Sequence, residues 1–155
     1  MDVAIVGAGP TGATAAIAFA KRGARVTLID GYPGAAQRFA GEWIHPPGVR
    51  ALRRLGVDVG RLAAREGHGF AILGDDGGDP ICLPYDGEVG IARLHSELVS
   101  RLREEACGHA GVHYLPSHVF VRLEGEHTLC LEDRERGRSV RVSADRIVGA
   151  DGRGS

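Results

Sequence analysis

The sequence predicts an α/β domain in which a parallel sheet carries antiparallel additions. Three features predict this class: a βαβ pattern that begins with the first residues, an amphipathic helix followed directly by a strand, and a run of short strands near the C-terminal end. A βαβ unit is typical of parallel sheets, whereas consecutive short strands are typical of an antiparallel meander.

The first third of the chain predicts one βαβ unit, a loop and a second helix. Val3 to Val6 is apolar without alternation, as in a strand buried on both faces. The alanine-rich stretch from Thr11 to Lys21 predicts a helix, and the β-branched run from Arg25 to Ile29 predicts the next strand. Residues 31 to 45 are rich in glycine and predict a loop, and Pro47 to Leu55 predicts a helix with one apolar face.

Downstream, the sequence predicts a hairpin, a helix, a strand, a three-stranded meander and a final strand. The hairpin comprises Phe70–Leu73 and Ile81–Leu83, the helix Leu94–Ala106, and the next strand Val112–Leu115. The meander falls near 119–123, 128–132 and 139–142, and the final strand at Arg146–Gly149.

The composition is that of an ordinary globular domain with an excess of glycine. Of the 155 residues, 43% are hydrophobic and 25% are charged, which suits a single domain with one core. The 24 glycines follow no short period, so they exclude collagen and solenoid repeats and indicate turns where backbone approaches a ligand. The net charge of −1 has both signs interspersed, so no nucleic-acid or anionic-lipid partner is expected.

The cysteines and the N-terminus favour a cytoplasmic location. Cys82, Cys107 and Cys130 form no C-x-x-C pair, so neither a disulfide framework nor a zinc site is expected. Asp2 replaces the basic start of a secretion signal, and no apolar stretch approaches the roughly 20 residues of a membrane span. The seven histidines lack metal-ligand spacing, so no metal site is expected.

Three glycines lie between the first strand and the first helix as Gly7-x-Gly9-x-x-Gly12. In a dinucleotide-binding turn, the first glycine makes the tight turn, the second lets a pyrophosphate approach, and the third allows close packing of helix and strand. Pro10 and Thr11 open the helix, whose N-terminal N–H groups and positive dipole end suit a diphosphate.

Asp30 ends the second strand, where a carboxylate is expected to accept bonds from a ribose hydroxyl pair. A glycine pattern alone is a weak signal, and the alternative is that the glycines only turn a tight corner. Strand, glycines, helix, second strand and terminal acid together predict a dinucleotide site. The pattern does not decide between FAD and NAD.

Four segments resemble the class A flavoprotein monooxygenases, most of all their squalene epoxidase-like members. They are the glycine-rich start, "RFAGEWIHPPGVRALRRLGV", "IARLHSELVSRL" and "RIVGADGRGS". The second segment is similar to the R-x-x-G-E-x-x-x-P-x-G segment of squalene epoxidases, although His45 stands where those proteins tend to have glutamine. The resemblance implies a glutathione-reductase-type, Rossmann-like FAD-binding domain, with the beginning of a substrate-domain hairpin.

The same resemblance implies further FAD contacts. Arg38 would lie near the phosphates or ribityl chain, Arg93 near the ribityl phosphate, Val119 against the adenine, and Asp151 beside the dinucleotide. A solvated arginine is the alternative for Arg38 and for Arg93. Glu42, in the same segment as Arg38, is the acid that most merits testing. No catalytic residue is implied, because the flavin carries the chemistry.

The resemblance also implies an activity for a longer protein. Residues 1–155 would be its FAD-binding domain, truncated here, with about 66–90 contributing to a substrate-side sheet. NADPH or NADH and O2 would serve to epoxidise or hydroxylate an apolar or aromatic small molecule. The alternatives are a flavin-dependent halogenase, a prenyl reductase-like enzyme, and a catalytically inactive nucleotide-binding fragment. The sequence predicts no oligomeric state.

Overall fold

The computed structural model describes residues 1–36, 40–75 and 77–152. A four-stranded parallel sheet lies at its centre, with the strand order β12-β1-β2-β8. Its strands are β1 (Asp2–Val6), β2 (Arg25–Asp30), β8 (Val112–Pro116) and β12 (Arg146–Gly149). Because β1 lies between the second strand of the chain and the last, the strand order reverses at β1, where α/β proteins bind ligands.

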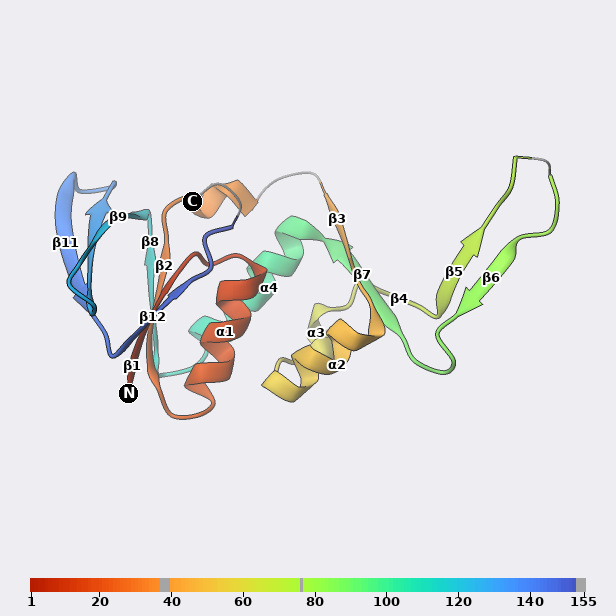
Figure 1. Ribbon diagram of the computed structural model, residues 1–155, viewed down its shortest axis with the longest axis horizontal. Coiled ribbons are helices and arrows are strands. Elements are labelled where there is room, and N and C mark those ends of the chain that lie inside the picture. The colour runs from red at the N-terminus through yellow and green to blue at the C-terminus, as the bar shows by residue number, and fades with distance from the viewer. Residues whose placement is uncertain (37–39, 76, 153–155) are drawn as a thin grey trace.

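Two helices cover one face of this sheet and an antiparallel meander covers the other (Figure 1). The helices are α1 (Pro10–Ala20) and α4 (His95–Cys107), and the meander consists of β9 (His118–Glu124), β10 (Thr128–Asp133) and β11 (Arg138–Ser143). Along β1, Val3 and Ile5 join the core under the helices, whereas Ala4 and Val6 join the core under the meander. This double burial explains why β1 is apolar without alternation.

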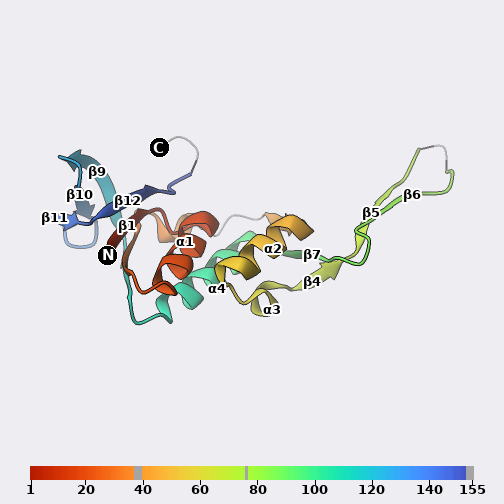
Figure 2. The ribbon, with the colours of Figure 1, turned by 60° about the horizontal axis from the view of Figure 1, so that its bottom comes forward.

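The remaining elements extend away from the parallel sheet. A three-stranded antiparallel sheet has the order β3-β7-β4, from β3 (Gly41–Ile44), β7 (Gly90–Leu94) and β4 (Arg65–Gly67). The short helices η1 (Pro33–Ala36), α2 (Pro46–Leu55) and α3 (Val59–Leu62) connect it to the rest. The hairpin of β5 (Gly69–Ile72) and β6 (Ile81–Pro84) projects at the end opposite the meander (Figure 2).

The predicted fold class is confirmed, and the predicted hairpin and meander are both present. The prediction that residues 31 to 45 form only a loop was wrong, because they contain η1 and β3. β3 is four residues long and pairs with β7, a partner distant in sequence that was not predicted either. Leu94 precedes α4 as an exposed residue instead of lying on its buried face. In the described part of the chain, no helix is long and apolar enough to cross a membrane.

Candidate functional site

Two glycine-rich corners meet at the carboxyl end of β1. The first follows β1 and the second follows β12, its neighbour in the sheet. The N–H of Gly7 donates to the carbonyl of Ile29 at 2.8 Å, and the N–H of Ala150 donates to the carbonyl of Val6 at 2.7 Å. Corners from opposite ends of the sequence are therefore fixed side by side at the reversal point of the sheet.

The contact between these corners leaves no room for a side chain at Gly7 or Gly12. A β-carbon on Gly7 would lie 2.3 Å from the carbonyl oxygen of Ala150 and 2.6 Å from the backbone nitrogen of Asp151. Gly7 also has φ +101°, a conformation that side chains rarely adopt. A β-carbon on Gly12 would lie 1.8 Å from the carbonyl oxygen of Gly7. Both glycines are therefore required by packing.

Gly9 differs, because a β-carbon there would meet no atom of the described residues within 4 Å. Gly9 is the N-cap of α1, where no side chain caps the helix and no acidic residue lies in the first turn. Thr11 is exposed beside it. An uncapped helix N-terminus with an open approach is suited to a phosphate group, because its free N–H groups and dipole favour negative charge.

Asp30, at the end of β2, is only 6% exposed and has three partners among the described residues. Its Oδ1 accepts from the backbone N–H of Tyr32 at 3.2 Å, and its Oδ2 accepts from the hydroxyl of Tyr114 at 3.0 Å. The guanidinium of Arg103 forms an ion pair with the same Oδ2 at 2.6 Å. Burial, and secondly the Asp30 carboxylate, raise the pKa of Tyr114 well above its ordinary value, so the Tyr114 hydroxyl keeps its proton and donates.

Neither Arg103 nor Tyr114 was predicted from the sequence as a site residue. Arg103 lies on α4 four residues after the buried Val99 and directly after the buried Leu102. In the sequence, Arg103 could have been recognised only as a charged residue at the edge of the apolar face of a helix. Which carboxylate it would meet depends on how α4 packs against the sheet.

The whole chain, residues 1–155, matches the family described as "FAD binding domain". The chain belongs to this family. Its glycine corners thus lie in a domain whose cofactor is FAD, and the residues present fit that cofactor. They provide an open backbone at Gly9, an uncapped helix N-terminus for the diphosphate and an acid at the end of β2.

Curated relatives of this FAD-binding domain include monooxygenases and epoxidases. Squalene monooxygenase of Rattus norvegicus is 28% identical over 97% of the chain, which spans 28% of that protein. The 6-methylpretetramide 4-monooxygenase of Streptomyces rimosus is 32% identical over 98% of the chain and 38% of that protein. Squalene epoxidase 4 of Arabidopsis thaliana is 36% identical over 81% of the chain and 26% of that protein. The domain therefore spans well under half of these relatives.

Solved structures also share the fold of this chain, and the chain again covers less than half of each. A 2-methyl-3-hydroxypyridine-5-carboxylic acid oxygenase superposes with a TM-score of 0.79 at 25% identity, over 99% of this chain and 40% of that one. The flavin-dependent monooxygenase PieE, in complex with FAD and substrate, has a TM-score of 0.74 at 25% identity, over 98% of this chain and 30% of that one. PqsL from Pseudomonas aeruginosa, at 24% identity and TM-score 0.76, shares the fold over the whole chain and 43% of its own.

Two further predicted contact residues lie near the corners. The backbone nitrogen of Asp151 lies beside Gly7, and Asp151 itself is exposed. A β-carbon on Gly31, directly after Asp30, would lie 3.1 Å from Cγ2 of Val119. The structure thus brings Asp151 next to the glycine loop and Val119 next to the predicted ribose-binding acid. Their contacts with FAD remain predictions.

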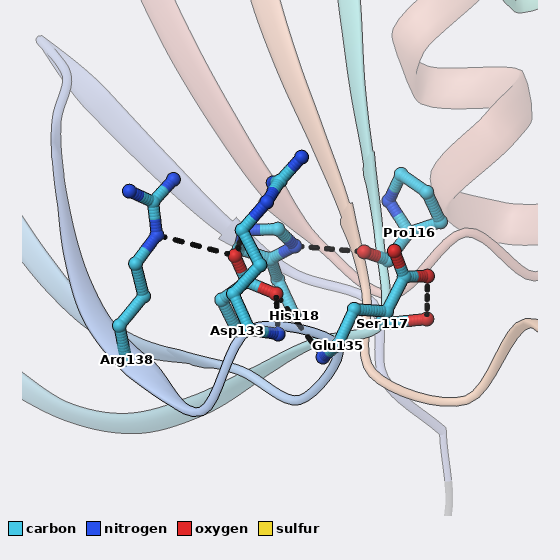
Figure 3. A network of polar contacts seen from close by, with 7 residues as sticks. Pro116, Ser117, His118, Asp133, Glu135 and Arg138 are labelled. Carbon is cyan, nitrogen blue, oxygen red and sulfur yellow. Dashed lines mark hydrogen bonds and ion pairs between the residues drawn. The ribbon is translucent and has the colours of Figure 1, made fainter.

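The strand that carries Val119 begins in a polar network around Asp133 (Figure 3). His118 donates from Nδ1 to the carbonyl of Pro116 at 2.7 Å and holds Nε2 3.9 Å from Oδ2 of Asp133. The Asp133 carboxylate accepts from the backbone N–H groups of Glu135 and Arg136, both at 3.1 Å. This network fixes the β10–β11 turn to the start of β9.

Arg93 makes its contacts away from the residues just described. It donates from Nε to the carbonyl of Leu62, from Nη2 to that of Ala63 at 3.1 Å, and from Nη1 to Glu97 at 2.8 Å. Its predicted approach to the flavin remains a prediction. Arg38 lies outside the described residues. Glu42 pairs with His95, with 2.6 Å between Oε1 and Nδ1.

Proposed function

We propose that this domain holds FAD with its diphosphate at the N-terminus of α1, and that it forms the N-terminal part of a flavin-dependent monooxygenase. The main support is the contact between the two corners at the point where the strand order reverses. The backbone at Gly9 is open at this point. Binding sites in open α/β sheets lie at such reversal points, beyond the carboxyl ends of the strands.

In this proposal each group of the site has a binding or positioning role. The first-turn N–H groups of α1 hold the diphosphate, and the missing β-carbon of Gly9 lets it approach. Asp30 accepts a ribose hydroxyl, and Val119 packs on the adenine side next to Gly31. Asp151 lies beside the same loop and contributes to FAD binding. Bound FAD would supply the redox and oxygen-transfer chemistry.

The reaction of the longer protein is inferred from its relatives. Those named above are monooxygenases, epoxidases and an oxygenase, which favours oxygenation over the halogenase and reductase alternatives. The proposed enzyme uses NADPH or NADH and O2 to epoxidise or hydroxylate an apolar or aromatic small molecule. Because the domain spans a minority of each relative, the residues that select substrate belong mostly to the remainder.

The segment of about 66–90 is proposed to contribute to a substrate-side sheet. Its hairpin exposes a set of large apolar side chains: Phe70, Ile72, Leu73, Ile81 and Leu83. Exposed apolar residues in such number on one hairpin favour further packing partners. A cytoplasmic location is also proposed, because all three cysteines are free and two of them, Cys82 and Cys107, are exposed.

Direct titration with FAD tests the proposal. Purified chain is titrated into FAD while flavin emission and the visible absorption bands are recorded, and ADP is then added as a competitor. We expect quenched emission, shifted bands and reversal by ADP, because the diphosphate and adenosine would supply much of the binding. A chain that is folded by circular dichroism and leaves the flavin spectrum unchanged would refute the proposed function.

A further inference from the structure

Arg103 joins three segments that surround the proposed cofactor site. Its Nε donates to the carbonyl of Ala8 at 2.7 Å, in the corner after β1, and its Nη1 donates to the carbonyl of Pro33 at 3.1 Å. Its Nη2 lies 2.6 Å from Oδ2 of Asp30. The side chain is only 17% exposed. A guanidinium suits this arrangement, because its donors project in fixed directions from one plane.

These contacts determine how much of the Asp30 carboxylate remains available. An ionised carboxylate has about four acceptor positions, two on each oxygen. Oδ2 accepts from the Tyr114 hydroxyl and forms the ion pair with Arg103, so these two groups enclose it. Oδ1 is used once, by the backbone N–H of Tyr32. Among the residues that the structure describes, the acceptor position left open on the acid lies on Oδ1.

We propose that Arg103 is a positioning residue of the cofactor site, which orients the Asp30 carboxylate so that it accepts from one ribose hydroxyl of the adenosine and not from both. The inference rests on the proposed FAD function. It differs from the general expectation for an acid at the end of the second strand, which is contact with a hydroxyl pair.

The physical reason lies in the burial of the pair. The Asp30 side chain is 9% exposed and the Arg103 side chain 17% exposed, so neither is freely solvated. Arg103 and Tyr114 hold one oxygen of the Asp30 carboxylate. Because the carboxylate is rigid, these contacts also set the direction of its second oxygen. Without Arg103 the carboxylate would lose this orientation, and the Ala8 and Pro33 carbonyls would lose a donor.

The experiment measures binding of ADP, 2′-deoxy-ADP and 3′-deoxy-ADP to the chain, by displacement of FAD. For the unchanged chain we expect one deoxy analogue to bind about tenfold more weakly than ADP and the other within about twofold, because one charge-assisted hydrogen bond is lost in only one of them. Arg103→Met is expected to weaken ADP itself and to reduce the tenfold preference to about twofold or less.

Two further variants separate orientation from stability. Arg101→Met is the matched control, since Arg101 lies on the same helix and pairs with the exposed Glu104. It is expected to keep the tenfold preference. Arg103→Lys keeps the charge but lacks the forked guanidinium that reaches both carbonyls. Its preference between the two deoxy analogues is expected to fall below about threefold. If Arg103→Met does not fold, Arg103→Lys supplies the decisive measurement.

The outcomes distinguish this inference from the proposed function. If the unchanged chain binds neither FAD nor ADP, the proposed function itself fails. If it binds ADP but both deoxy analogues lose tenfold, or neither does, the single acceptor position is wrong. If an Arg103 variant binds all three nucleotides more weakly by the same factor, the role of Arg103 is purely structural. That outcome overturns the positioning role.

Discussion

A β-carbon on Gly7 would lie 2.5 Å from the carbonyl carbon of Ala150, so the corner after the first strand and the corner after the last strand are in direct backbone contact. The contact places the exposed Asp151 beside the glycine loop, although the two lie at opposite ends of the sequence. The binding corner is thus complete only when β12 has joined β1.

Replacing Gly7 by alanine tests this contact. Alanine at Gly7 suffers backbone strain from φ +101° and a clash with the second corner. Gly23→Ala is the matched control, because Gly23 has φ +80° but nothing within 4 Å of its β-carbon position. Gly23→Ala should cost about 1 kcal/mol of unfolding free energy, and Gly7→Ala about 2 kcal/mol more. Urea unfolding gives both values, and equal costs would contradict the contact.

Gly9→Ala separates binding from folding. Its β-carbon would enter open space, so the free energy of unfolding should change by less than about 1 kcal/mol. The same methyl group would occupy the approach of the diphosphate, and the Kd for FAD should rise at least about tenfold. Gly60→Ala, where the nearest atom is an ordinary 3.4 Å away, should leave the Kd unchanged. An unaltered Kd in Gly9→Ala would place the diphosphate elsewhere.

Arg93→Met distinguishes a structural role from contact with the flavin. The guanidinium donates to the Leu62 and Ala63 carbonyls with its side chain 15% exposed, so its loss should cost about 1–2 kcal/mol of unfolding free energy. The Kd for ADP should stay within about twofold, since the contacts of Arg93 with the described residues do not reach the corners. A larger loss in FAD affinity than in ADP affinity would support the flavin contact that the family resemblance implies.

The glycine corner and its acid were predictable because they obey local rules. Gly7, Gly9 and Gly12 stand at a fixed spacing between an apolar run and an alanine-rich helix, and Asp30 follows the next strand. Each position is set by the conformation of its immediate neighbours along the chain. The positions of these residues in the structure follow the sequence prediction, with helix and strand ends shifted by a residue.

Other features were not predictable, because distant segments create them. β3 is four residues long and forms by pairing with β7, and neither run alternates clearly. Arg103 is one of two arginines on a charged helix, and only the packing of α4 brings it to Asp30. The same packing leaves one acceptor position on the acid, whereas the sequence pattern suggested a site for two hydroxyls.

The Asp133 network makes stability depend on pH. Burial alone would raise the pKa of the Asp133 carboxyl, but the backbone N–H of Arg136, the Arg138 side chain and the charge of His118 together lower it below its ordinary value. A folded-state pKa below the unfolded value, about 3.9 for aspartate, contributes stability that is fully present above pH 4 to 5. This stability is lost as the pH falls through the folded-state pKa.

Asp133→Asn should therefore lower the free energy of unfolding at pH 7 and flatten its decline between pH 5 and pH 3. The amide cannot accept from the two backbone N–H groups and two arginines as a carboxylate does. Asp79→Asn, which removes a carboxylate in the exposed part of the β5–β6 connection, is the control for charge alone. Urea unfolding across this pH range gives the curves. If Asp133→Asn and Asp79→Asn have the same pH dependence as the unchanged chain, the network contributes nothing to acid sensitivity.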